Sequence, residues 1–121
     1  MVEQEKSKFE LYGNCMVIHC GEDLDHHHAV ELRDKSDRLI ERGNVQNIVF
    51  DFQGVDFMDS SGIGFVMGRY RKVMFSGGKV ALSGIGPAVD RIFGLSGLYN
   101  IMDKYDTVSD AIYGLKQPEA K

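Results

Sequence analysis

Long apolar runs, clusters of basic residues and cysteines are all scarce in this chain of 121 residues. No apolar stretch approaches the roughly 20 residues that a helix needs to cross a bilayer, so no membrane span is predicted. The chain has 14 basic and 18 acidic residues, and its net charge of −4 without a Lys/Arg cluster argues against nucleic acid or an anionic membrane as a partner. Because the charged start of the chain lacks the apolar segment of a signal peptide, we expect the protein to work in the cytoplasm.

The only cysteines, Cys15 and Cys20, are expected to remain free thiols. They lie five positions apart in a predicted strand, where residues an odd number apart face opposite sides of the sheet. A disulfide within that strand is therefore not expected, which agrees with a reducing compartment. A chain of this length can bury a core as one domain without disulfides or a structural metal.

The hydrophobic pattern alternates between strand and helix periods. We predict strands over 9–12, 15–20, 47–52 and 79–83, with a brief edge strand at 101–102. Helices are predicted over 25–42, 63–74, 87–95 and 108–115. Strands joined through helices form parallel crossovers, so the expected fold is a single α/β domain with a mixed, mostly parallel sheet of four to five strands and about four helices. The domain is expected to span 9–115, with flexible ends at 1–8 and 116–121.

Two features of the predicted helices concern their surfaces. In the helix over 25–42, where Asp25 is a candidate N-cap, the polar face carries charges of both signs and is expected to be solvated and of little energetic weight. In the next helix, Gly64 and Gly68 lie four positions apart and share a face. Glycine inside a helix costs about 1 kcal/mol relative to alanine. We therefore expect close approach of the sheet or of a partner at this face.

The sequence Phe-Met-Asp-Ser-Ser-Gly-Ile-Gly over 57–64 stands where a buried strand gives way to a helix. A helix N-terminus carries unpaired N–H donors and a partial positive charge, and short polar residues and glycine are favoured there. One interpretation is a well-capped helix start and no more. The other is that Ser60 or Ser61 is placed on a rigid, exposed corner to react or to be modified.

Motifs for nucleotide binding and serine hydrolysis are both incomplete. No G-x-x-x-x-G-K-[ST] sequence occurs, and Val89 stands where a dinucleotide-binding fingerprint beginning at Gly84 needs its third glycine. A nucleophile elbow needs glycine two positions before and two after the serine, and neither Ser60 nor Ser61 meets this requirement. We predict no cofactor, and we keep a small nucleotide-binding or hydrolase domain as the alternative from a different class.

Three consecutive histidines, His26, His27 and His28, could supply a base if their loop lies beside the serine corner. Adjacent histidines at a helix start point in different directions, so at most one or two could face the serines. Exposed or capping histidines are the other interpretation. The spacing suits a metal poorly, because metal ligands on a helix favour one face, and no metal site is predicted.

Phosphorylation is a further possibility for this corner. A phosphoserine adds close to two negative charges, and a helix N-terminus accommodates them. The modified domain is therefore expected to stay folded. The added charge, together with Asp25 and Asp59, would instead change a docking surface.

Several linked motifs resemble the STAS domain of anti-sigma-factor antagonists. They are Met-Asp-Ser-Ser-Gly-Ile-Gly over 58–64, Ile-Gly-Pro-Ala-Val-Asp-Arg-Ile-Phe over 85–93 and Leu-Ser-Gly-Leu over 95–98. With Leu-Asp-His-His over 24–27, the chain is most similar to the sporulation-type members that regulate sigma factor F. The resemblance spans 9–115.

The resemblance implies a regulator that is not an enzyme. In this family the unphosphorylated antagonist binds an anti-sigma factor that is also a serine kinase, and the sigma factor is released. The kinase uses ATP to phosphorylate the second serine of the Asp-Ser-Ser-Gly motif, here Ser61, and a PP2C-type phosphatase restores the free form. The surface expected to bind the partner comprises Asp25, His26, His27, Asp59, Ser60, Ser61, Gly62, Ile63 and Gly64.

One departure from the family pattern concerns the loop before the first long helix. The family usually has Gly-Glu-Leu-Asp there, whereas this chain has the longer Gly-Glu-Asp-Leu-Asp over 21–25. The extra residue leaves the placement of Asp25 open and adds a negative charge near Ser61. We expect Gly62 and Gly64 to let another protein's backbone approach the acceptor hydroxyl, and the chain to be a monomer or weak homodimer. A STAS module of another pathway, such as stress signalling, is the alternative within the family.

Overall fold

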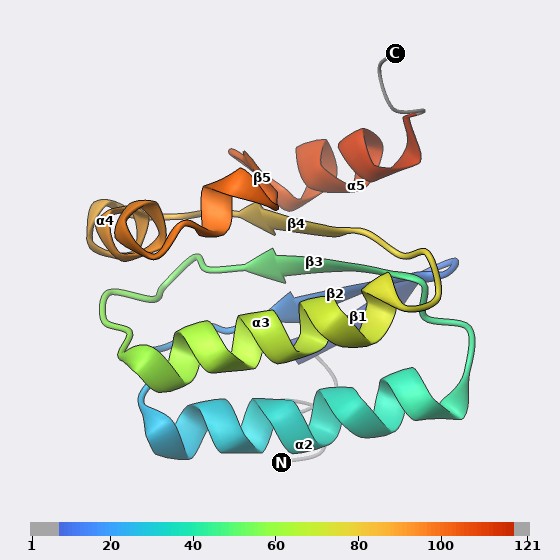
Figure 1. The fold of residues 1–121 in the computed structure, drawn as a ribbon, viewed down its shortest axis with the longest axis horizontal. Helices are drawn as coiled ribbons and strands as arrows, with labels where there is room; N and C mark the ends of the chain where they lie inside the picture. Colours follow the sequence, from blue (N-terminus) through green and yellow to red (C-terminus); the bar gives the residue numbers. More distant parts are fainter. Residues whose placement is uncertain (1–7, 118–121) are drawn as a thin grey trace.

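Five strands form one mixed sheet in the order β1-β2-β3-β4-β5 (Figure 1). β1 (Phe9–Tyr12) pairs antiparallel with β2 (Cys15–His19). Parallel pairing then continues through β3 (Asn47–Asp51), β4 (Val80–Ser83) and β5 (Asp103–Tyr105). The predicted α/β class, with a mostly parallel sheet and an antiparallel N-terminal strand, is confirmed.

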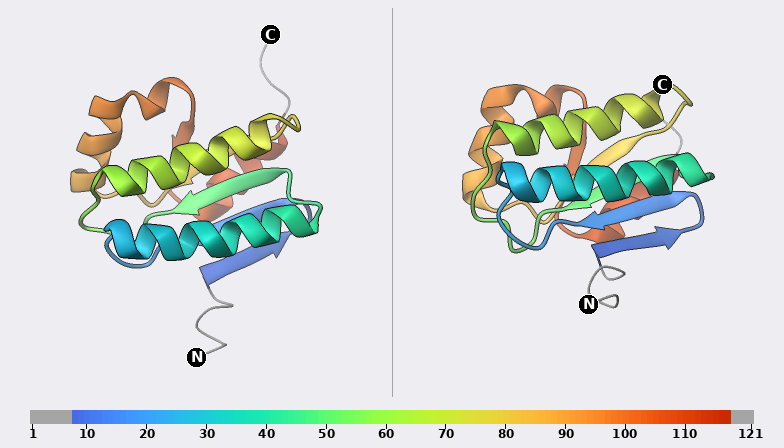
Figure 2. Two further views of the ribbon diagram at one scale, coloured as in Figure 1. Left: turned by 60° about the horizontal axis from the view of Figure 1, so that its bottom comes forward. Right: turned by 90° about the horizontal axis from the view of Figure 1, so that it is seen from below.

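Helices cover both faces of this sheet. α2 (His26–Arg42) and α3 (Ser60–Met74) lie side by side on one face, and α5 (Val108–Lys116) covers the other (Figures 1 and 2). α4 (Pro87–Ser96) and the short 3₁₀ helix η1 (Leu98–Asn100) follow β4 at its C-terminal end. Because both faces are covered, the central strands are apolar on both sides.

A computed structural model describes residues 8–117 of the chain. Most of the two segments predicted to be flexible, 1–8 and 116–121, lies outside the described residues. α5 extends to Lys116, one residue beyond the predicted end of the domain.

The alternation of side chains across the sheet divides the apolar interior in two. Ile48 and Phe50 of β3 belong to the larger cluster beneath α2, α3 and α4, whereas Val49 belongs to the smaller cluster beneath α5. Cys20 and Cys15 are buried in the larger and the smaller cluster respectively, and both are free thiols. The prediction that they face opposite sides is confirmed, and burial raises the pKa of each thiol.

Two predicted boundaries are wrong. The edge strand at 101–102 is a turn in which the N–H of Met102 donates to the carbonyl of Leu98, and pairing with β4 begins only at Asp103. β5 has the polar sequence Asp-Lys-Tyr, which has no apolar pattern typical of a strand. Backbone pairing with β4 therefore specifies this strand. α3 begins at Ser60, three residues before the predicted start, because the side chain of Asp59 caps it.

The polar face of α2 is not wholly solvated as predicted. Asp37 Oδ1 lies 3.1 Å from Arg69 Nε of α3, and Arg69 is only 5% exposed. Burial lowers the pKa of the Arg69 guanidinium, and the charge of Asp37 opposes this effect. The guanidinium also lies 5.6 Å from the ring centre of Phe65. The seam between α2 and α3 therefore contains an ion pair, and loss of one partner would leave a buried charge.

Candidate functional site

The corner between β3 and α3 is joined to the loop that precedes α2. Leu24 and Met58, both buried, form an isolated parallel bridge. The N–H of Leu24 donates to the carbonyl of Phe57 at 2.9 Å, and the N–H of Asp59 donates to the carbonyl of Leu24 at 3.3 Å. The N-terminal ends of α2 and α3 are therefore held next to each other.

A carboxylate caps each of these two helix ends. Asp25 Oδ1 accepts the N–H of His28 at 2.9 Å, and Asp59 Oδ1 accepts the N–H of Ser61 at 2.9 Å. Each cap satisfies a donor that the helix leaves unpaired and meets the positive end of the helix dipole. The predicted N-cap at Asp25 is confirmed, so the extra residue in the preceding loop does not displace it.

The lengthened loop gives Asp23 a structural contact. Its Oδ1 accepts the N–H groups of Asp56 and Phe57, both at 3.1 Å. The added carboxylate therefore fastens the loop before α2 to the loop before α3. The sequence predicted that Asp23 adds a negative charge near Ser61. We expect the main effect of Asp23 to be the rigidity that these hydrogen bonds give to the corner.

The Ser61 hydroxyl lies at the second position of α3, beside the first residue of α2. Its Oγ is 3.2 Å from Nδ1 of His26. Ser61 is half-buried, whereas Ser60 and His26 are exposed. The hydroxyl donates to Nδ1 when that nitrogen carries no proton, and it accepts a hydrogen bond when the nitrogen is protonated. The predicted proximity of the histidine loop and the serine corner is thus confirmed.

The other two histidines have different surroundings. His27 is exposed, and His28 is buried with its Nδ1 2.8 Å from the carbonyl oxygen of Asp23, so an N–H at Nδ1 donates to that carbonyl. Of the three histidines, His26 is the one that contacts Ser61. This agrees with the expectation that at most one or two could face the serines.

The Ser61–His26 pair lacks the third member of a catalytic triad. The carboxylates of Asp25 and Asp59 accept backbone N–H groups, and within residues 8–117 none is hydrogen-bonded to His26. An unoriented imidazole is poorly placed to act as a general base for a serine nucleophile. Within residues 8–117, the Ser61–His26 pair therefore does not reproduce the arrangement of a catalytic triad.

A cleft of about 290 Å³ runs beside Ser61, between α2 and α3. Its lining includes the serine, Gly64 and Phe65 of α3 and four residues of α2, which are His26, Ala29, Val30 and Arg33. Sequence reasoning missed Arg33 because it was assigned to the solvated face. The signal that could have found it is its spacing from His26 and Val30, since positions i, i+4 and i+7 share one face of a helix.

The glycines of the corner have different roles. A Cβ on buried Gly62 would lie 2.5 Å from Met58 Cγ, so the space that we expected to admit a partner is already filled from within the chain. Ile63 is half-buried and packs against the core. A Cβ on Gly64 or Gly68 would meet no atom within 4 Å. The prediction that the sheet closely approaches these two glycines is therefore wrong. The approach of a partner to them stays a prediction.

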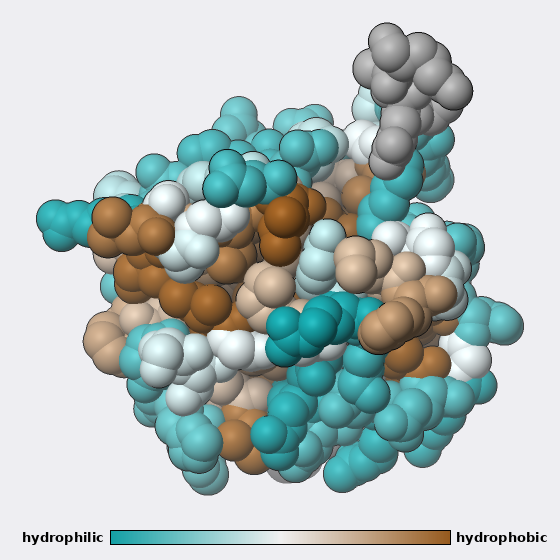
Figure 3. Space-filling view, viewed as in Figure 1, coloured by the Kyte–Doolittle hydropathy of each residue, from teal (hydrophilic) through white to brown (hydrophobic). Residues whose placement is uncertain are grey.

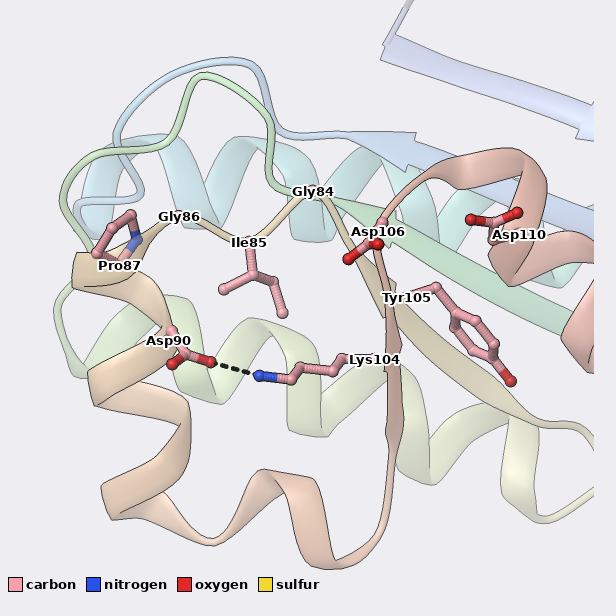
Figure 4. Close-up of a pocket in the computed structure, with 9 residues that line it drawn as sticks. All are labelled: Gly84, Ile85, Gly86, Pro87, Asp90, Lys104, Tyr105, Asp106 and Asp110. Carbon is pink, nitrogen blue, oxygen red and sulfur yellow. Dashed lines mark hydrogen bonds and ion pairs between the residues drawn. The ribbon is translucent and has the colours of Figure 1, made fainter.

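A second concave site lies at the C-terminal ends of β4 and β5 (Figure 4). Its cavity of about 720 Å³ is bordered by the loop over 84–87. Lys104 Nζ and the Tyr99 hydroxyl donate to Asp90 Oδ1, at 2.9 and 2.6 Å. These hydrogen bonds lower the pKa of the Asp90 carboxyl, and the bond from Tyr99 has the largest effect. The remaining charged residues that line this cavity are Asp106 and Asp110, and such surroundings do not favour the phosphates of a nucleotide.

Among residues 8–117, no group of three or more histidine, cysteine, aspartate and glutamate side chains is placed to hold a metal ion. No helix in the same range has the length and apolar character needed to cross a membrane.

The fold and the serine corner together define a small α/β module of the STAS type. The family model described as the STAS domain matches residues 6–111, so the chain belongs to the STAS family, as its motifs predicted. The match covers all five strands and the whole of the serine corner.

Two curated relatives carry antagonist names. The chain is 33% identical over 109 residues to the anti-sigma F factor antagonist of Paenibacillus polymyxa, which covers 90% of this chain and 93% of that protein. It is 30% identical over 90 residues to the anti-sigma-B factor antagonist of Bacillus subtilis (strain 168), which covers 74% of this chain and 81% of that protein.

Two solved structures extend this likeness to the fold. The chain matches the anti-sigma factor antagonist SpoIIAA in its unphosphorylated form with a TM-score of 0.81 and 33% identity, over 93% of this chain and 97% of that one. It matches the Bacillus cell fate determinant SpoIIAA in the phosphorylated form with a TM-score of 0.73 and 33% identity, over 89% and 97%.

Proposed function

We propose that this chain is an anti-sigma-factor antagonist, which binds an anti-sigma serine kinase when Ser61 is free and releases it when Ser61 is phosphorylated. The observation that carries this proposal is the Ser61 hydroxyl, half-buried at the second position of α3 on a corner that is fastened by hydrogen bonds. The names of the relatives, and the existence of SpoIIAA in both phosphorylation states, support it. In this role the chain is a substrate and not an enzyme.

The chemical step is phosphoryl transfer to Ser61. Its Oγ forms a bond to the γ-phosphorus of ATP while the bond from that phosphorus to the β,γ-bridging oxygen breaks and ADP leaves. The hydroxyl proton passes to a base on the kinase. The product is a dianion at a helix N-terminus, where the dipole and free N–H groups stabilise negative charge. A PP2C-type phosphatase would restore the hydroxyl by hydrolysis.

The new charge acts on binding rather than on folding. It would join the carboxylates of Asp25 and Asp59 at a surface that also presents exposed Ser60, His27 and Gly64. A kinase surface that fits a neutral hydroxyl then faces an added dianion, and like-charge contact and desolvation of the phosphate both oppose association. A cleft of about 290 Å³ opens beside Ser61, so there is space next to the hydroxyl for a phosphate.

The decisive experiment is phosphorylation of the purified chain by a cognate anti-sigma kinase and ATP, measured by intact-protein mass spectrometry. We expect one phosphate per chain in the wild type and in Ser60→Ala, and none in Ser61→Ala. Ser60→Ala is the matched control because it removes the neighbouring, more exposed hydroxyl. Equal modification of Ser61→Ala and the wild type would show that the site is wrong.

The likeness to a sigma-B antagonist favours a second candidate, a STAS antagonist of a stress-response pathway. Affinity capture on the immobilised chain separates the two candidates if the captured kinase is identified and its sigma factor is then displaced by added antagonist. Displacement of sigma factor F, and of no other sigma factor, supports the sporulation-type assignment. An ATP-dependent partner of this kind would place the chain in the cytoplasm.

A further inference from the structure

The cleft beside Ser61 contains two side chains that can carry positive charge. His26 lies at its mouth, with Nδ1 3.2 Å from Ser61 Oγ, and Arg33 lines the same cleft about two helical turns further along α2. α2 and α3 run in the same direction, with their N-terminal ends side by side (Figure 2). Helical side chains lean toward the N-terminus, so the long side chain of Arg33 can be turned along the cleft toward Ser61.

Phosphorylation would change the hydrogen bond between His26 and Ser61. The free hydroxyl can donate to the imidazole or accept from it. A phosphoserine has no hydroxyl hydrogen on Oγ, and its dianion offers only acceptors. The contact is then retained only if His26 donates, and a protonated imidazole does so with the added strength of a charge-assisted bond.

Within residues 8–117, Arg33 is paired with the adjacent Asp34, and this pair is weak. Its Nη2 and Nε lie 3.1 and 3.2 Å from one oxygen of the adjacent Asp34, and both side chains are about half exposed. Ion pairs at this exposure contribute little to stability. A phosphate dianion offers two oxygens to the guanidinium fork, so exchange of Asp34 for the phosphate is favourable.

The charges that face the cleft favour an anion in it. From α2 these are His26 and Arg33, and Arg33 is paired with Asp34. Buried Arg69 of α3 does not line the cleft, and its charge is paired with Asp37. The opposing carboxylates, Asp25 and Asp59, accept backbone N–H groups at the two helix caps. The cleft therefore presents imidazole, guanidinium and two helix N-termini to Ser61.

We propose that the phosphate of phosphorylated Ser61 is bound within the chain itself, in the α2–α3 cleft, by His26 and Arg33. This inference rests on the proposed modification of Ser61 and adds the place that the phosphate occupies. The cleft is thus an intramolecular phosphate site between the two helices. The switch would hide part of the new charge in its own groove and remove His26 from the docking surface.

The test uses the full chain with phosphoserine inserted at position 61 during translation, so that no kinase is needed. Phosphorus NMR follows the second ionisation of the phosphate between about pH 4 and pH 8. Because a nearby cation favours the dianion, we expect its apparent pKa in the wild type to lie about one unit below that in His26→Gln. Arg33→Gln should also raise the apparent pKa of the phosphate above the wild-type value. The double variant with His26→Gln and Arg33→Gln should raise this pKa most.

Arg38→Gln is the matched control, because Arg38 is an exposed arginine of the same helix that does not line the cleft. It should titrate like the wild type. Equal titration of the wild type, His26→Gln and Arg33→Gln would overturn the proposal and place the phosphate in solvent. The phosphate is installed without the kinase, so the two proposals can fail separately. If the cleft binds the phosphate but the kinase does not modify Ser61, only the proposed function is refuted.

Discussion

Two of the corners where the chain turns from a parallel strand into a helix, before α3 and before α4, are comparable, and only the corner before α3 places a serine beside a histidine. The α4 corner borders the larger cavity, about 720 Å³ against about 290 Å³, and Figure 3 shows hydrophobic residues gathered around α4. Its lysine is already paired with Asp90. The α3 corner has a smaller cleft but offers a hydroxyl beside an imidazole. The size of a cavity therefore does not identify the site.

The two corners also match position by position. Ser61 is the second residue of α3, and exposed Ala88 is the second residue of α4. The side chain of Asp59 caps α3, whereas Gly86 precedes α4 without a side-chain cap and Pro87 begins the helix. A substitution at one corner therefore has a control at the other.

The largest expected effect comes from a negative charge at the second helical position. Ser61→Glu should weaken binding of the anti-sigma kinase roughly 100-fold or more, because like-charge contact at an interface costs several kcal/mol. Ala88→Glu places the same charge at the equivalent position of α4 and should bind like the wild type. Isothermal calorimetry with the purified kinase measures both. Similar losses in the two variants would mean that binding responds to net charge and not to the α3 corner.

A hydroxyl moved to the second corner sharpens the comparison further. Ser61→Ala with Ala88→Ser presents a serine at the second position of a helix, without the neighbouring imidazole and the caps of Asp25 and Asp59. We expect no phosphate incorporation by the kinase under conditions that modify the wild type fully. Mass spectrometry gives the result, and modification at position 88 would show that any serine at such a helix start suffices.

Removal of the cap of α3, or addition of a cap to α4, should change the free energy of unfolding moderately. Asp59→Ala removes a side-chain cap and should lower the free energy of unfolding by about 1 kcal/mol, a fall of about 4 °C in thermal midpoint. Gly86→Ser supplies a side-chain cap to α4 and should raise stability by only about 0.3 kcal/mol. Thermal unfolding followed by circular dichroism measures both changes. A larger effect at Gly86 would contradict the assignment of the caps.

The smallest expected effect is pH-dependent and belongs to the α4 corner. Hydrogen bonds from Tyr99 and Lys104 lower the pKa of the Asp90 carboxyl, so its stabilisation is present above the unfolded pKa and is lost as the pH falls through the folded pKa. Asp90→Asn should lower the thermal midpoint by no more than a few degrees at pH 7. In acid the variant and the wild type should converge. A difference that grows toward low pH would reverse the sign of this contribution.

The sequence predicted the fold well wherever apolar period and capping residues agreed. Asp25 and Pro87 mark helix starts by short-range chemistry, so both were found. β5 was displaced because its polar residues are held by pairing with β4, which no local pattern reveals. The pairing of Asp37 with Arg69, and the contact of Gly62 with Met58, depend on how two segments meet in space.

The candidate site was predicted in part. The motif placed Ser61 at the start of a helix, and the loop order suggested that the histidines lie nearby. That His26 alone reaches Ser61 follows from the bridge between Leu24 and Met58, which sets the spacing of the two helices. The helical pattern predicts that Arg33 faces solvent with the other charged residues of α2, whereas the cleft lies at the margin of that face.

The bridge between Leu24 and Met58 and the two hydrogen bonds accepted by Asp23 hold the loops before α2 and α3 in one arrangement. Each interaction that favours this arrangement lowers the fraction of the protein in other conformers, and so lowers the affinity lost to a conformational equilibrium before a partner binds. If Ser61 is phosphorylated as proposed, the fraction of the protein that can bind its partner then follows the unphosphorylated fraction. In that case the relative rates of kinase and phosphatase, and not a slow rearrangement of the corner, set the concentration of active antagonist.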